Sequence, residues 1–167
     1  MGVKELGHLV LYVSDIERSA TFYRDVLGFN QVFPEIPAGN GANTPDGPSP
    51  LRVPIAAFSS GRTHHELLLI EVGSGAQPIP LGRRLGMYHF GLKVGDTDAE
   101  LSEVWKRIEH AGVTITGSSD HTVTHSLYIE DPDGNEIELY IDVAGVDWRS
   151  DPRLIASPIR PLQLERS

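Results

Sequence analysis

In the first half of the chain, apolar residues recur with two different spacings, one typical of strands and one typical of helices. Residues 9–13 (LVLYV) form a short apolar run with β-branched members, which is typical of a strand. Ser14 and Asp15 then signal a helix start and Gly28 a helix stop, and the apolar residues between them recur at helical spacing. Residues 34–50 are rich in Gly, Pro and Asn, so they predict a loop that is either disordered or a functional flap. The pattern predicts a helix over 18–27 and strands over 9–13, 29–33, 51–58 and 65–72.

The second half repeats this order of elements. Its helical stretch, 99–111, has Leu101, Val104, Trp105 and Ile108 at helical spacing. The run DPDGN at 131–135 is typical of a hairpin connection. The predicted strands are 89–94, 113–116, 126–130 and 136–141.

Matching polar residues support a duplication. His8 and His89 each lead an apolar run, 81 residues apart, and each is followed seven residues later by an Asp. Each half also closes with an acid beside or within an apolar run, Glu66 in the first and Glu138 in the second. Two such copies are too few and too long for a solenoid. We therefore expect an α+β fold of two strand–helix–strand–strand–strand modules, over about 6–73 and 86–141, with an irregular C-terminal tail over 142–167.

The composition and net charge of the chain exclude several classes of protein and partner. The length of 167 residues predicts a single domain over 1–167, which is long enough to bury a substantial hydrophobic core. The chain has no cysteine, which excludes disulfides, thiolate ligands and a cysteine nucleophile and fits a cytoplasmic protein. A net charge of −9 argues against nucleic acid as a partner. The apolar runs are too short to span a membrane, and the beginning of the chain lacks the pattern of a signal peptide.

Three stretches carry a resemblance to a known family. They are Gly7-His8 with its downstream helix signal, the YHF at 88–90, and the DPDGNEIEL at 131–139. In these features the chain resembles the vicinal oxygen chelate superfamily, which includes glyoxalase I, bleomycin resistance proteins and extradiol dioxygenases. The resemblance implies that the two modules form a half-open mixed β-barrel around one divalent metal ion.

The same resemblance implies the metal ligands. The family's metal positions fall on His8, His89 and Glu138, with Glu66 as a possible fourth ligand. Two imidazoles and one carboxylate form the facial triad of non-haem Fe(II) enzymes, with Mn(II), Ni(II) or Zn(II) as other candidates. Four protein ligands would instead resemble glyoxalase I.

The stretch HHEL at 64–67 separates two enzyme classes. His65 resembles the acid–base histidine of extradiol dioxygenases, whereas Glu66 resembles a glyoxalase ligand. Neighbouring strand residues point to opposite faces, so a regular strand aims only one of the two at the metal. Tyr128 resembles the active-site tyrosine of the dioxygenases, and His121 resembles a further histidine of that site, with His125 left as an alternative.

These residues favour a single-domain extradiol dioxygenase that cleaves a catechol-type aromatic diol with O₂. Its catalytic residues would be His65, Tyr128 and His121. A glyoxalase I-like lyase or isomerase and a non-catalytic small-molecule binding protein are the alternatives. The family resemblance also implies a homodimer or larger homo-oligomer.

Overall fold

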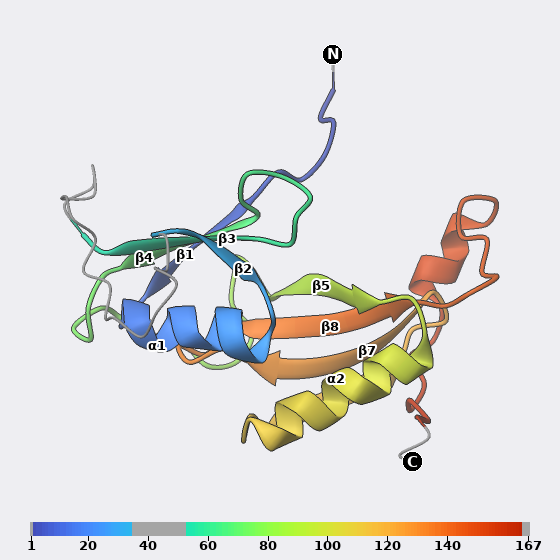
Figure 1. Ribbon diagram of the computed structural model, residues 1–167. Helices are drawn as coiled ribbons and strands as arrows, with labels where there is room; N and C mark the ends of the chain where they lie inside the picture. Colours follow the sequence, from blue (N-terminus) through green and yellow to red (C-terminus); the bar gives the residue numbers. More distant parts are fainter. Residues whose placement is uncertain (1, 35–52, 165–167) are drawn as a thin grey trace. The chain divides into compact units, whose positions relative to one another are not determined.

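The computed structural model describes residues 2–34 and 53–164, so most of the predicted loop over 34–50 lies outside the described residues. The chain divides into two compact units, 1–78 and 79–167, close to the predicted module boundaries. Each unit contains a four-stranded mixed sheet with a helix after its first strand (Figure 1). The α+β class and the repeated module are confirmed, whereas the single domain and the half-open barrel stay predictions.

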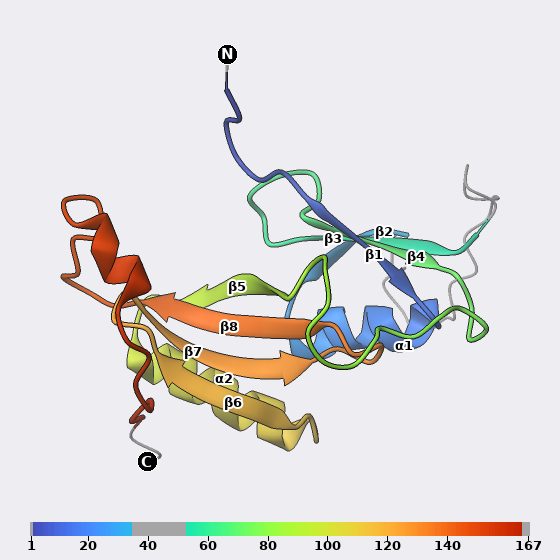
Figure 2. The ribbon, with the colours of Figure 1, turned by 180° about the vertical axis from the view of Figure 1, so that it is seen from behind.

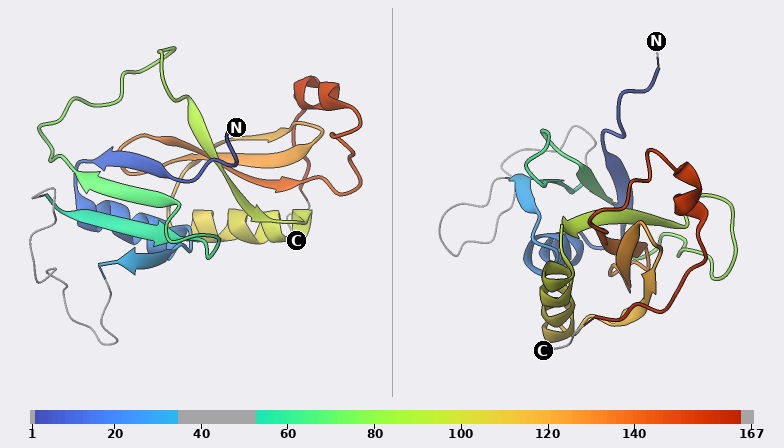
Figure 3. Two further views of the ribbon diagram at one scale, coloured as in Figure 1. Left: turned by 90° about the horizontal axis from the view of Figure 1, so that it is seen from above. Right: turned by 90° about the vertical axis from the view of Figure 1, so that its right-hand side faces the viewer.

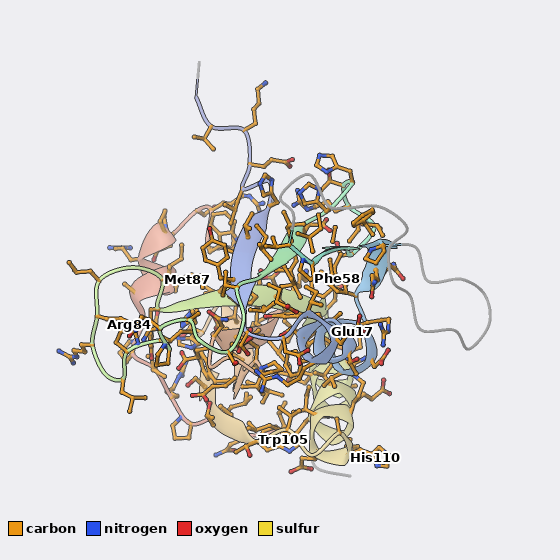
Figure 4. All side chains as sticks on the ribbon, turned by 90° about the vertical axis from the view of Figure 1, so that its left-hand side faces the viewer. Glu17, Phe58, Arg84, Met87, Trp105 and His110 are labelled. Atoms are coloured by element: carbon orange, nitrogen blue, oxygen red, sulfur yellow. The ribbon has the colours of Figure 1, made fainter. Side chains whose placement is uncertain are left out.

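In the first unit, the first strand pairs in parallel with the last strand, and the sheet order is β1-β4-β3-β2. Its core includes Tyr23 and Phe58, both fully buried, whereas Glu17 is exposed on the helix; Phe58 and Glu17 are labelled in Figure 4. The elements are β1 (Leu9–Val13), α1 (Ile16–Thr21), η1 (Phe22–Val26), β2 (Asn30–Phe33), β3 (Ile55–Ser59) and β4 (Leu67–Glu71).

The predicted helix over 18–27 is in fact two helical segments. Asp15 caps α1, because its carboxylate accepts a hydrogen bond from the Arg18 N–H at 2.9 Å. A π-helical turn, η1, then replaces the second half of the α-helix. The adjacent aromatic residues Phe22 and Tyr23 of this turn are both buried.

The second unit repeats the topology with the sheet order β5-β8-β7-β6, and β5 runs parallel to β8. Figures 2 and 3 show α2 lying along one face of this sheet. Among the described residues of the chain, no helix has the length and apolarity needed to cross a bilayer. The elements are β5 (His89–Gly95), α2 (Asp98–His110), β6 (Ile115–Asp120), β7 (Thr124–Glu130), β8 (Glu136–Asp142) and η2 (Pro152–Ala156).

A capping box starts α2. Thr97 accepts from the Glu100 N–H at 3.3 Å, and the Glu100 carboxylate accepts from the Asp96 N–H at 2.8 Å. Gly95 makes room for this arrangement, since a Cβ there would lie 2.7 Å from the Glu100 Cβ. The helix can therefore begin directly after β5.

The side chains of strand β8 alternate between the two faces of the second sheet. Its residues Ile137, Leu139 and Ile141 are buried, on the same side as the inward residues of α2. Glu136 and Glu138 alternate with them and are only partly buried. One face of the sheet is therefore the core, and the opposite face carries carboxylates.

Strand β6 differs most from the prediction. It was expected over 113–116 but runs from Ile115 to Asp120 and pairs with β7 along that length. Its residues after Thr116 are Gly, Ser, Ser and Asp, which carry no apolar signal. The ladder with β7 therefore sets the length of this strand.

Candidate metal and catalytic site

Strands β5 and β8 bring two of the predicted metal ligands together in the second unit. The Nε2 atom of His89 lies 3.2 Å from the Oε2 atom of Glu138. The His89 Nδ1 atom lies 3.2 Å from the Oε1 atom of Glu136, the residue opposite His89 in the parallel register. A carboxylate at one imidazole nitrogen commonly orients the other nitrogen toward a metal ion. His89 and Glu138 therefore direct one nitrogen and one oxygen donor into the same small volume.

Strand β7 places Tyr128 beside this pair. Tyr128 lies opposite Glu138 in the antiparallel register, and its hydroxyl donates to the Glu138 Oε1 atom at 3.3 Å. Burial, together with the negative charge of Glu138, raises the pKa of Tyr128. The phenol therefore keeps its proton and acts as a hydrogen-bond donor.

His121 completes a chain of contacts on the same face. Its Nε2 atom lies 2.7 Å from the Tyr128 hydroxyl oxygen and 3.9 Å from the Glu138 Oε1 atom. Since the Tyr128 hydroxyl donates its proton to the hydrogen bond with Glu138, its oxygen can accept a hydrogen bond from the His121 Nε2–H. The contacts therefore run from His121 through Tyr128 to Glu138.

His125 does not take part in this chain. It lies three residues before Tyr128 on β7, so the two side chains point to opposite faces of the sheet. Its Nδ1 atom instead lies 2.5 Å from the Oδ1 atom of Asp98, at the start of α2. Of the two histidines that the sequence left open, the structure brings only His121 to the carboxylate face.

Gly91 is a site residue that the sequence reasoning missed. It is the residue opposite Glu138 on β5, two positions after His89. A Cβ at this position would lie 3.2 Å from the Tyr140 ring and 3.7 Å from the Glu138 Oε2 atom. A glycine inside a strand commonly marks a place where another group comes close, which is the signal that could have found it.

His8 and His65 lie next to each other in the first unit, with ring centroids 4.9 Å apart. The Nδ1 atoms of His64 and His65 are 2.6 Å apart, so one of these two imidazoles donates a hydrogen bond to the other. Burial and the neighbouring imidazoles of His64 and His8 lower the pKa of His65. The neutral, proton-accepting form of His65 is therefore favoured near pH 7.

The Glu66 carboxylate is bound within the turn between β3 and β4. It accepts from the Ser60 N–H at 2.7 Å and from the Ser60 hydroxyl at 3.1 Å, and the Arg62 Nε atom lies 3.3 Å away. Burial raises the pKa of Glu66, but the bonds from Ser60 and the charge of Arg62 outweigh it, so the net pKa is lowered. Strand alternation does not decide which of His65 and Glu66 faces the metal, because both residues precede the regular strand β4, which begins at Leu67.

Arg62 is a second residue that the sequence reasoning missed. Beyond its contact with Glu66, its Nη1 atom lies 3.2 Å from the Glu5 carboxylate and its Nη2 atom donates to the Gly7 carbonyl at 3.1 Å. It thus connects the turn that carries His65 to the segment that precedes His8. An arginine in a Gly-Ser turn carries no signal of this role in the sequence.

The side chains fit the chemistry of a divalent metal ion. Two imidazoles and a carboxylate are the ligand set of a facial triad, and Glu136 already orients His89 for it. His8 belongs to the first unit, and His89 and Glu138 belong to the second. Over residues 2–34 and 53–164, no three His, Asp or Glu side chains gather in one metal-sized cluster. Binding of one ion by all three residues stays a prediction.

Comparison with models of known protein families identifies the family to which the chain belongs. The model of the Glyoxalase/Bleomycin resistance protein/Dioxygenase superfamily matches residues 5–139. This range contains His8, His65, His89, Tyr128 and Glu138.

Known relatives include dioxygenases and a lyase. The chain is 34% identical to catechol-2,3-dioxygenase of Bacillus subtilis, over 87% of this chain and 44% of that protein. It is 28% identical to biphenyl-2,3-diol 1,2-dioxygenase 3 of Rhodococcus globerulus, over 82% of this chain and 63% of that protein. The chain thus spans about half the length of these relatives. Its structure is similar to the crystal structure of lactoylglutathione lyase from Agrobacterium tumefaciens, with a TM-score of 0.56 and 26% identity over 84% of this chain and 95% of that one.

Proposed function

We propose that this chain, which belongs to the Glyoxalase/Bleomycin resistance protein/Dioxygenase superfamily, is an extradiol dioxygenase that cleaves a catechol-type aromatic diol with O₂. One observation carries the choice of reaction. The imidazole of His65 lies beside that of His8, while the Glu66 carboxylate is held by Ser60 and Arg62. This arrangement supports a histidine, and not a fourth carboxylate ligand, next to the metal. Similarity to two named dioxygenases supports the same choice.

In the proposed site, His8, His89 and Glu138 bind Fe(II). When bound, a divalent ion with these three ligands supplies further coordination positions at which both oxygens of a catechol and O₂ can be held side by side. Mn(II), Ni(II) and Zn(II) also suit the same ligands, because His and carboxylate sites follow metal availability as much as affinity.

His65 carries the proton transfer in this proposal. A catechol must lose a proton when it chelates a metal, and a neutral imidazole can accept it and later return it. The lowered pKa of His65 keeps that imidazole neutral near pH 7. The O–H of Tyr128 lies beside Glu138 and can donate to a substrate oxygen, with His121 fixing the phenol.

A glyoxalase I-like lyase or isomerase is the second candidate, favoured by the similarity to the lactoylglutathione lyase. It requires Glu66 to leave three contacts in its turn and become a metal ligand. A non-catalytic binding protein of the same superfamily is a third candidate. The convergence of His89 and Glu138 argues against it, because binding without a metal needs neither residue.

The test is a direct assay of protein purified without oxygen and loaded with Fe(II). We expect catechol or biphenyl-2,3-diol to give a yellow ring-cleavage product and consume O₂ in equal amount. A glutathione hemithioacetal should remain unchanged. Turnover of the hemithioacetal alone would replace the proposal with the lyase, and bound metal with turnover of neither substrate would favour the binding protein.

Assembly and location complete the proposal. We propose a homodimer or larger homo-oligomer located in the cytoplasm, as the family resemblance and the absence of cysteine suggest. Sedimentation at micromolar concentration tests the assembly, and a clean monomer would contradict it.

A further inference from the structure

The segment that follows β8 returns to the open edge of the second sheet. After η2 it reaches Arg160, whose backbone N–H donates to the Asp120 carbonyl and whose carbonyl accepts from the Asp120 N–H, both at 2.9 Å. Asp120 is the last residue of β6, the edge strand of the sheet. Figure 2 shows this segment leaving β8, forming η2 and turning back past the end of β6. The segment is therefore attached to the turn between β6 and β7.

The Arg160 side chain strengthens the attachment. Its Nη2 atom donates to the Thr122 hydroxyl at 2.9 Å, and its Nε atom lies 3.4 Å from the Asp120 Oδ2 atom. The other carboxylate oxygen of Asp120 accepts from the Thr122 N–H at 2.7 Å. Arg160 therefore binds the side chain of Thr122, and Asp120 binds its backbone N–H.

The turn held in this way is one that its sequence does not favour. Thr122 has a φ of +72°, in the left-handed region that β-branched residues rarely adopt. The turn closes where the His121 N–H donates to the Thr124 carbonyl at 2.9 Å. Such a backbone persists only where surrounding contacts fix it. Here the side-chain contacts to Thr122 come from Asp120 and Arg160, and the Val143 N–H donates to the neighbouring Val123 carbonyl at 2.9 Å.

The turn sets the position of His121, whose Nε2 atom lies 2.7 Å from the Tyr128 hydroxyl oxygen. We propose that Arg160 is a positioning residue: it holds the β6–β7 turn so that His121 stays hydrogen-bonded to Tyr128 beside Glu138. The catalytic part of this inference rests on the proposed function. The structural part, the dependence of the His121–Tyr128 bond on Arg160, does not.

The experiment compares Arg160→Ala with Arg153→Ala in the full chain. Arg153 is a matched control, because it lies in the same segment and its side chain pairs with Asp151, in its own segment. The first measurement is the side-chain ¹⁵N–¹H correlation spectrum of the histidines in metal-free protein. We expect the His121 signals to shift toward those of Tyr128→Phe in Arg160→Ala, to be partly restored in Arg160→Lys, and to be unchanged in Arg153→Ala.

The second measurement is kcat with a catechol on the Fe(II)-loaded protein. Misplacement of a catalytic group by an ångström or less costs up to about 100-fold, so we expect Arg160→Ala to lower kcat roughly 5- to 50-fold. In a His121→Ala background the same change should lower kcat less than about twofold, since residues acting through one contact are not additive.

Unchanged His121 signals in Arg160→Ala would overturn the proposal. An equal loss of kcat with and without His121 would also overturn it, because Arg160 would then act through another group. If the wild-type protein cleaves no catechol, the proposed function fails, and the spectra alone decide whether Arg160 positions His121.

Discussion

The His89 Nε2 atom and the Glu138 Oε2 atom lie 3.2 Å apart on the neighbouring parallel strands β5 and β8. Each atom is a good metal donor, and Glu136 orients the imidazole from its other nitrogen. We therefore predict that His89→Ala and Glu138→Ala each reduce bound Fe(II) from one ion per chain to background. His8→Ala should do the same. Metal analysis after anaerobic loading and desalting measures the loss, and circular dichroism checks that the fold is retained.

The control for this prediction is His125→Ala. His125 lies on the same strand as Tyr128 but points to the opposite face, where it pairs with Asp98. It should retain the metal in full. Stoichiometric metal in His89→Ala would mean that the ion binds elsewhere.

The second prediction separates the two enzyme classes. His65→Ala should keep the metal but lower the rate of ring cleavage by about 10²- to 10⁴-fold, the range for a lost acid–base catalyst. Glu66→Gln should change the rate much less, because the Glu66 carboxylate is bound by Ser60 and Arg62. Steady-state assays against a catechol and a glutathione hemithioacetal give both comparisons. For a lyase the order inverts: Glu66→Gln would lose activity and His65→Ala would be nearly normal.

Sequence periodicity was enough to predict the repeated module and the strands on which His89 and Glu138 lie. Buried residues at Ile137, Leu139 and Ile141 leave Glu138 on the opposite face, and this alternation is visible in the sequence. His89 matches His8 in the repeat, and this match placed His89 at the start of the first strand of the second module, β5, which pairs with β8. Local patterns are reliable here because burial on one side fixes the register of the strand.

The choices that failed or stayed open depend on turns. Alternation could not choose between His65 and Glu66, because both precede the regular part of β4. Alternation could not exclude His125 either, because the strand was predicted to begin at residue 126, whereas β7 begins at Thr124 and puts His125 on the face opposite Tyr128. The position of His121 depends on the turn at Thr122, whose φ is +72°. Turn conformations of this kind are fixed by distant partners such as Arg160, which no local pattern reveals.

The third prediction concerns Gly91. A Cβ at Gly91 would meet the Tyr140 ring at 3.2 Å, so Gly91→Ala should lower the free energy of unfolding by about 1–2 kcal/mol through overpacking. A Cβ at Gly117 would lie 3.6 Å from the Tyr128 ring, an ordinary contact, so Gly117→Ala should be neutral or stabilising by up to about 1 kcal/mol. Urea unfolding of both variants measures the difference. Equal stability of the two variants would show that the Tyr140 ring moves freely, so that Gly91 is not required by packing.

The last prediction uses the lowered pKa of Glu66. Its ordinary value is 4.5, and the folded state holds it lower because hydrogen bonds from Ser60 and the charge of Arg62 outweigh burial. The folded protein thus binds this proton less readily than the unfolded chain, so the contribution to stability is full above about pH 4.5 and is lost as the pH falls through the folded-state pKa. Glu66→Gln should therefore lower the free energy of unfolding by about 1–2 kcal/mol at pH 7, since the half-exposed Arg62 is screened by solvent. The gap should close toward pH 3, and urea unfolding at both pH values measures it. A gap that stays constant between pH 7 and pH 3 would mean that the shape of the side chain, and not its charge, stabilises the turn.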